Sequence, residues 1–271
     1  MNPKLFQALI YKLCEEGKKP KSARDTITLL KQIVRMGQEE GIINEFIFPR
    51  FKYPKDNTIK EKKAYSKNEI AKIVSKCFEE IENRSDERYC CLAILLAIFS
   101  GMRIGEICAL QFKDIDLEKK LIYVRKTLER IVTPLEKKRS KIVIQTPKTS
   151  DSIRDIPIQD KMLEIIKKLK IFDDDYVASG RKKYYEPRTL REHYVKLVKS
   201  LGIEPIKFHG LRHTFASINI ENGTDIKTIS ELLGHSGVEI TLDIYTHISN
   251  ETKANAINNY TTMLASEENG K

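Results

Sequence analysis

Apolar residues recur at helical spacing along most of the chain. In residues 3–15 and again in 27–36 they repeat every three or four positions, which is typical of helices that bury one face. The polar stretch EEGKKPKS separates the two patterns, with Ser22 as the expected cap of the second helix and Gly41 as its expected end. Residues 1–48 are therefore predicted to form a small helical module with a thin core.

The apolar period stops in residues 49–66, which read PRFKYPKDNTIKEKKAYS. Two prolines and many charges favour a linker that can cross a phosphate backbone. Ser66 followed by Glu69 matches a capping box, the signature of a helix start. A second, larger domain over 67–271 is expected to begin there.

The larger domain mixes two periodicities. Helical patterns cover 67–82 and 87–99, and the nearly continuous apolar run YCCLAILLAIFS indicates a helix buried all round. Residues 121–158 change to strand character in three segments, LIYVRKT, SKIVIQT and SIRDIPI, and helical patterns return at about 160–170 and 188–201. The fold class predicted is mainly α with a small antiparallel β-sheet (α+β).

Charge and composition narrow the function class. The formal net charge is +10, and residues 1–63 alone hold 14 Lys and Arg against 8 Asp and Glu. A basic balance favours a polyanionic partner, most simply nucleic acid. There is no apolar run of membrane-spanning length, no signal-peptide pattern, no CxxC pair and no nucleotide-binding loop. We therefore expect a cytoplasmic protein that associates with the nucleoid when bound to DNA, without membrane contact, metal or other cofactor.

Most candidate chemistry lies in residues 209–245, HGLRHTFASINIENGTDIKTISELLGHSGVEITLDIY. His209 and Arg212 are three residues apart and can face one ligand from a helix start. Gly234 is a helix stop signal that presents His235 at a turn, and Tyr245 follows within another helical pattern. Each residue alone is more often a surface ion pair, a structural histidine or a packed ring, but the combination favours convergence on one anionic group.

Two further cationic residues, Arg103 and Lys148, also lie at predicted turns. Arg103 follows a buried helical run and Gly101, and Glu106 is placed to pair with it. Lys148 falls in the turn TPKTSDSIR between the last two strand patterns, where a lysine is usually solvated but can also reach a phosphate.

These motifs, SGMRIGE, TPKTSDSIRDIPI, HGLRHTFAS, LLGH and TLDIYTH, resemble those of the tyrosine recombinase (phage integrase) family in order and spacing. The resemblance covers about 65–250 well and the N-terminal part more loosely. It implies the tyrosine recombinase catalytic fold preceded by a short helical core-binding domain. It also implies a site-specific recombinase that cleaves and rejoins DNA through a 3′-phosphotyrosyl intermediate, without ATP or metal.

The same resemblance assigns roles to individual residues. Tyr245 corresponds to the nucleophile, with a helix after it that is exchanged between protomers. The remaining catalytic positions are Arg103, Lys148, His209, Arg212 and His235, and the supporting ones are Glu106 and His213. Contacts to DNA are expected from Lys19, Lys21, Arg24, Lys31, Arg154 and Arg181. The expected assembly is a homo-tetramer on paired DNA sites, with accessory DNA-bending or directionality factors as further partners.

Several alternatives remain open on the sequence. The first helix of the core-binding domain and a separate arm-site domain are expected to be missing, as in a truncated or shortened protein. A DNA-binding protein without catalysis and a type IB topoisomerase are alternatives from other classes. Within the family, the Lys- and Ile-rich composition and the TLDIYTH ending favour the integrase of a phage or integrative mobile element over a chromosome dimer resolvase.

Overall fold

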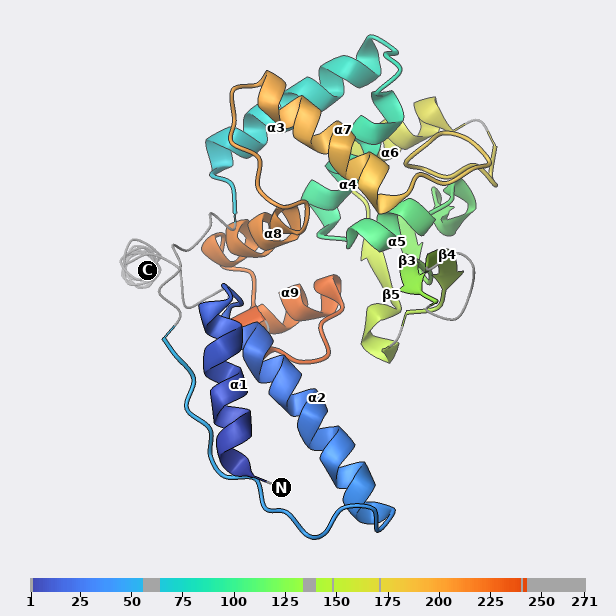
Figure 1. Cartoon of the computed structure of the whole chain (residues 1–271). Coiled ribbons are helices and arrows are strands. Elements are labelled where there is room, and N and C mark those ends of the chain that lie inside the picture. The colour runs from blue at the N-terminus through green and yellow to red at the C-terminus, as the bar shows by residue number, and fades with distance from the viewer. Residues whose placement is uncertain are drawn as a thin grey trace, which may run out of the picture. The chain divides into compact units, whose positions relative to one another are not determined.

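The computed structural model describes residues 2–55, 64–133, 140–147, 149–170, 172–239 and 241–242 (Figure 1). Its contacts divide the chain into two compact units, Met1–Glu61 and Lys62–Lys271, and each unit is described by itself. The division falls inside the segment predicted to be a linker. Lys148, Tyr245 and the helix expected after Tyr245 lie outside the described residues.

The first unit is built on two helices, α1 (Pro3–Glu15) and α2 (Pro20–Glu39), which pack against each other. Both begin with proline in the first turn, where the missing N–H would have no helical partner. Ser22 therefore lies inside α2 and does not cap it, contrary to the sequence expectation. Ile10, Ala23 and Ile27 form the small core.

Both ends of the segment 49–66, which was predicted to be a linker, pack against the neighbouring units. Phe51 and Tyr53 pack against the core of the helical hairpin, and the amide of Gln7 exchanges two hydrogen bonds with the backbone of Lys52, at 2.7 and 2.9 Å. Tyr65 is buried in the second unit. Prolines and charges dominate the composition of the segment, but burial of its few aromatic rings decides where it packs.

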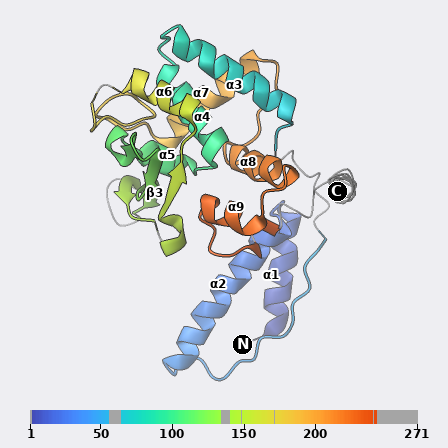
Figure 2. The ribbon, with the colours of Figure 1, turned by 180° about the vertical axis from the view of Figure 1, so that it is seen from behind.

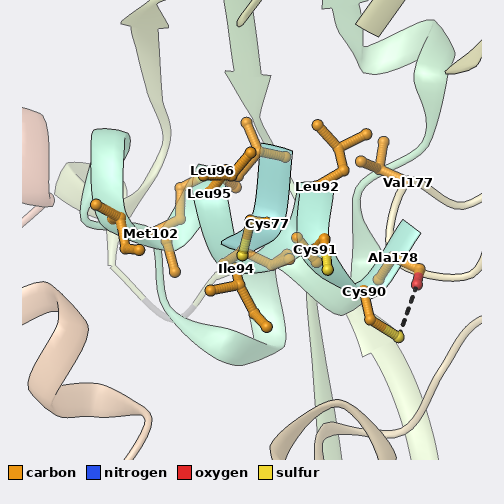
Figure 3. Close-up of a cluster of buried hydrophobic side chains, with 14 of the residues drawn as sticks. Cys77, Cys90, Cys91, Leu92, Ile94, Leu95, Leu96, Met102, Val177 and Ala178 are labelled. Atoms are coloured by element: carbon orange, nitrogen blue, oxygen red, sulfur yellow. Dashed lines mark hydrogen bonds between the residues drawn. The ribbon is translucent and has the colours of Figure 1, made fainter. Parts of the chain in front are cut away.

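The second unit is organised around α4 (Arg88–Ser100), whose side chains are nearly all buried, as the sequence predicted (Figure 3). It packs against α3 (Lys67–Glu82), which begins with the predicted Ser66–Glu69 capping box. Cys77 and Cys91 face each other across these two helices as buried free thiols. Gly101 ends α4 with a φ of +62°, and α5 (Ile104–Ala109) follows.

The strand region forms two antiparallel sheets where one was predicted. The first has the order β1-β2-β5, and β3 pairs only with β4 in the second. The strands are β1 (Ile115–Asp116), β2 (Leu121–Val124), β3 (Thr127–Val132), β4 (Ser140–Gln145) and β5 (Arg154–Pro157), with short 3₁₀ turns η1 (Phe112–Asp114) and η2 (Ser150–Ser152). Strands β4 and β5, which flank the predicted turn, therefore belong to different sheets.

The remaining helices are α6 (Asp160–Leu169), α7 (Pro187–Ser200), α8 (His209–Glu221) and α9 (Ile226–Leu233). Helix α8 packs against both α4 and α9, and Figure 2 shows α8 and α9 together from behind. Among the described residues, no helix combines the length and apolar character needed to cross a membrane.

Candidate active site

Arg212 is the most deeply buried cation of the site. It lies on the first turn of α8 with only 2% of its surface exposed, because α8 packs directly against α4. Its Nη1 donates to the carbonyl oxygen of Gly101 at 3.0 Å, whereas its buried Nη2 has no hydrogen-bond partner in the part of the chain that the structure describes. Burial, followed by the charges of Arg103 and Arg154, lowers the pKa of Arg212 to about 9. A buried donor without an acceptor can bind an oxygen atom of a ligand or of a water molecule.

Arg103 reaches the same place from the turn after α4. Its Nη1 pairs with Oε1 of Glu106 at 2.8 Å, its backbone N–H donates to Oε2 at 2.9 Å, and its Nη2 donates to the carbonyl oxygen of Gly234 at 2.9 Å. About a third of the side chain stays exposed. Arg103 is thus fixed on two sides while part of its guanidinium faces solvent.

Gly101 lets these segments approach each other. Its φ of +62° is in the left-handed region, and a Cβ there would lie 2.5 Å from Leu233 and 2.8 Å from Phe215. A larger residue would therefore separate the end of α4 from the α8–α9 pair. The approach keeps the Gly101 carbonyl oxygen within reach of Arg212.

Glu106 is the acidic group of the cluster and is 2% exposed. Burial alone would raise its pKa, but the guanidiniums of Arg154 and Arg103 more than offset this, and the pKa lies below its usual value. Arg154 contacts it with two nitrogens, Nη2 to Oε2 at 2.9 Å and Nη1 to Oε1 at 3.2 Å. One carboxylate therefore holds two arginines.

Two histidines complete the described cluster. His209, at the start of α8, is exposed to solvent, yet the protein atoms around it lower its pKa to about 4, with further lowering by His213, Arg212 and Arg103. The rings of His209 and His213 meet edge to face, with centroids 4.8 Å apart. Partial burial and the same arginines lower the pKa of His235 to about 3. His209 and His235 are therefore neutral at physiological pH.

His235 is also held by a hydrogen bond. Gly234 ends α9 with a φ of +65°, as its sequence position predicted, and the chain turns to place His235 beside Thr241. The Nδ1 atom of His235 lies 2.9 Å from Oγ1 of Thr241, which is fully buried. A hydroxyl that donates to Nδ1 selects the tautomer with hydrogen on Nε2.

The structure thus brings together six residues that the sequence singled out: Arg103, Glu106, His209, Arg212, His213 and His235. Sequence reasoning did not identify the hydrogen bond between Thr241 and His235, nor the close contacts of Gly101. Thr241 lies four residues before Tyr245 in TLDIYTH, but a threonine in that position carries no signal of its own.

Arg154 corrects an expectation. It was predicted to contact DNA, but only 9% of its surface is exposed and its guanidinium is bonded to Glu106 and to backbone carbonyls. The start of β5 is covered by the end of α9, which explains the burial. By contrast, Lys19, Lys21 and Arg181 are exposed, and their DNA contacts remain predictions.

The two other predicted DNA contacts in the first unit lie over aromatic rings. The guanidinium of Arg24 lies 4.8 Å from the ring centre of Tyr53, and the amine of Lys31 lies 5.6 and 5.2 Å from those of Phe48 and Phe51. Cations held over ring faces have a restricted position and keep their charge. This geometry is compatible with phosphate contacts, which also stay a prediction.

One group of potential metal ligands lies elsewhere in the described residues. The ligand atoms of Glu87, Cys90 and His193 are within 4.8 Å of one another, a proximity that sequence spacing could not reveal. However, Glu87 pairs with both His193 and Lys196, and burial raises the pKa of the Cys90 thiol to about 12. The group is therefore explained as an ion pair beside a protonated thiol.

Comparisons with known proteins agree with this site. The family model described as "Phage integrase family" matches residues 63–252. A protein named "Tyrosine recombinase XerC-like" from Caldanaerobacter subterraneus subsp. tengcongensis is 31% identical, in an alignment that covers 93% of this chain and 68% of the relative. The ICEBs1 integrase of Bacillus subtilis is 29% identical, with 87% of this chain and 64% of the relative covered. The chain thus spans about two thirds of the length of these relatives.

Among solved structures, the integrase of transposon Tn1549 in complex with a circular intermediate DNA superposes with a TM-score of 0.74. The match covers 96% of this chain and 85% of that chain at 19% identity, so it shows a shared fold. The family match extends over most of the second unit, where the two arginines and the histidines converge. The chain belongs to the phage integrase family of tyrosine recombinases.

Proposed function

We propose that this chain is a site-specific DNA recombinase of a mobile element, and that Tyr245 is its nucleophile. The observation that carries the proposal is the buried Nη2 of Arg212, which lacks a partner in the described chain and lies in a cluster with Arg103. Guanidinium groups bind phosphate oxygens with a fork geometry that lysine cannot copy. A scissile phosphate is the anion that such a pair would bind.

The proposed cleavage step uses Tyr245 together with the two arginines. The Oη atom of Tyr245 attacks phosphorus, a P–O bond to tyrosine forms, and the P–O5′ bond breaks. Arg103 and Arg212 neutralise the non-bridging oxygens, each with a contribution of roughly 3 kcal/mol in the transition state. Because the 3′-phosphotyrosyl link keeps the bond energy, the liberated 5′-hydroxyl of a partner strand can reverse the step without ATP.

Proton transfers complete the step. His209 accepts the phenolic proton of Tyr245, which requires a neutral imidazole, and its pKa of about 4 supports this. His235 donates from Nε2 to a non-bridging oxygen, which requires the Thr241 hydroxyl to donate to Nδ1. Lys148 gives a proton to the departing 5′ oxygen. Lys148 and Tyr245 enter the proposal from the sequence motifs alone.

The proposed partners follow from the family. Double-stranded attachment sites are the substrate, bound by both units, and a homo-tetramer on two paired sites exchanges strands with the C-terminal helix shared between protomers. Exposed Lys19 and Lys21 support phosphate contacts from the first unit. Accessory DNA-bending or directionality factors would set the direction of integration and excision.

A chromosome dimer resolvase is the second candidate. The 31% identity to a XerC-like recombinase favours it, and the match to the integrase of ICEBs1 favours the mobile-element enzyme. A recombination assay on two plasmids discriminates them. An integrase joins two non-identical attachment sites, whereas a dimer resolvase recombines two copies of one chromosomal site.

A nicked suicide duplex tests the chemistry. The duplex carries the attachment site of the encoding element, with a nick beside the scissile phosphate, so the released fragment diffuses away and the covalent complex accumulates. We expect a protein–DNA band on a denaturing gel for the wild-type chain and none for Tyr245→Phe. Specific binding without any covalent band would refute catalysis and favour a DNA-binding protein that has lost it.

A further inference from the structure

Arg154 makes more directed hydrogen bonds than a surface arginine could. It opens β5, and its Nε donates to the carbonyl oxygen of Leu232 at 2.6 Å. Its Nη1 donates to the carbonyl oxygen of Ser152 at 3.1 Å, and its two terminal nitrogens contact the carboxylate of Glu106 at 3.2 and 2.9 Å. All three guanidinium nitrogens are therefore engaged.

Two of these partners, Glu106 and Leu232, lie beside a proposed catalytic residue. Glu106 holds the backbone N–H and the Nη1 of Arg103. Leu232 lies in the last turn of α9, directly before the turn that presents His235. Ser152 ends η2, the short helix that follows Lys148 in the chain. The guanidinium of Arg154 thus contacts three segments that are far apart in the sequence.

We infer that Arg154 is a positioning residue for cleavage: its guanidinium fixes Arg103 through Glu106 and anchors the end of α9, which directly precedes His235. The inference rests on the proposed recombinase function. Arg154 does not contact the phosphate itself, since its nitrogens are used inside the protein.

Neighbouring backbone segments enclose Arg154 closely on several sides. Its backbone pairs with Val124 in β2, and Arg125 donates to its carbonyl oxygen at 2.8 Å, so the start of the side chain is fixed. A Cβ on Gly234 would lie 3.1 Å from its Nη1, so the turn before His235 closes directly on the guanidinium. Lysine has three N–H donors, but all are on one nitrogen, and it cannot reach acceptors that lie around three nitrogens of a planar guanidinium.

Loss of Arg154 would act first on Glu106. Without Arg154, burial would favour the protonated carboxyl group, which no longer attracts Arg103 as an ion. Arg103 would then lose its fixed orientation toward the non-bridging oxygens. The defect should resemble partial loss of Arg103, while contacts between DNA and the rest of the chain remain.

The test compares Arg154→Gln and Arg154→Lys with Arg88→Gln in the full chain. Arg88 also donates to two backbone carbonyls, but at the opposite end of α4, about 18 Å along the helix from the site. Single-turnover cleavage is measured on two suicide duplexes. One has the normal scissile phosphate, and in the other a methyl group replaces a non-bridging oxygen, so that less negative charge needs neutralising.

On the normal phosphate, we expect both Arg154 variants to cleave about 100-fold more slowly than wild type, the loss typical of one missing charge-stabilising donor. DNA affinity should stay within about 2-fold, because no phosphate contact is removed. On the methylphosphonate the defect should shrink to less than about 10-fold, since the role of Arg103 is reduced there. Arg88→Gln should cleave both duplexes like wild type.

Other outcomes separate the two proposals. Arg154 variants that cleave like wild type, or that lose equal activity on both duplexes, would overturn the positioning role and leave the recombinase function intact. If Arg154→Gln does not fold, Arg154→Lys keeps the buried charge and carries the test alone, judged by its melting transition and its two cleavage rates. If the wild-type chain itself forms no covalent complex, the proposed function fails and the positioning role fails with it.

Discussion

Replacing Arg212 by methionine should stabilise the fold while abolishing cleavage. Burial lowers the pKa of Arg212 to about 9, from an ordinary value of about 12.5, which corresponds to roughly 5 kcal/mol at about 1.4 kcal/mol per unit. Methionine removes this penalty but also removes the hydrogen bond to the Gly101 carbonyl, worth about 2 to 3 kcal/mol for a charged donor. The net gain expected is about 2 kcal/mol.

Calorimetry of the full chain without DNA measures this gain. For a unit of this size, about 2 kcal/mol should raise the melting temperature by about 4 to 8 °C. Arg212→Lys is the matched control, because it keeps a buried charge and should melt well below Arg212→Met. Inorganic phosphate should stabilise the wild-type chain more than the methionine variant. A methionine variant that melts at or below the wild-type temperature would refute the idea that the buried charge of Arg212 is uncompensated and destabilises the fold.

Three further predictions concern the turn at α9 and the histidines. Thr241→Val removes the hydroxyl that holds the ring of His235 through Nδ1, so cleavage should fall about 10-fold with DNA affinity unchanged; an unchanged cleavage rate would contradict that role. Gly234→Ala should lower the free energy of unfolding by about 2 kcal/mol in urea titrations, because the residue has a φ of +65° and its Cβ would lie 2.8 Å from the carbonyl oxygen of Asp151; equal midpoints would count against this packing. The pKa values of His209 and His235 are about 4 and about 3 in the fold but about 6.5 in the unfolded chain, so the unfolded chain takes up protons first. The free energy of unfolding should be constant above about pH 6.5 and decrease below it. Replacing both histidines by glutamine should make that decrease smaller, as measured by melting curves at a series of pH values.

Local signals in the sequence predicted the helices well. Helix α4 is apolar at nearly every position between Arg88 and Ser100, and the Ser66–Glu69 capping box marks the start of α3, so each element is determined by neighbouring residues. The second sheet was harder to predict. Strand β3 contains Glu129 and Arg130 between apolar residues, and its pairing with β4 depends on contacts formed only in the fold.

The residues of the site also differ in how well the sequence predicted their positions. The HxxR spacing of His209 and Arg212 survives in the structure as one turn of α8, because both residues lie on one helix. The burial of Arg154 could not be predicted, since its partners Glu106 and Leu232 are 48 and 78 residues away in sequence. In a basic chain, the sequence does not distinguish a buried arginine from one that binds DNA, because the acceptors of its hydrogen bonds are known only from the fold.

The charge balance of the cluster explains why one carboxylate is present. Arg103, Arg154 and Arg212 carry three positive charges, and Glu106 is the acidic group that acts on them in the described chain. Two positive charges remain uncompensated, and the neutral histidines add none. A phosphodiester carries one negative charge, and attack on phosphorus places a second on its non-bridging oxygens, so the charges match the transition state better than the ground state. A second carboxylate would remove that preference, and without Glu106 Arg154 would be buried without a counter-charge.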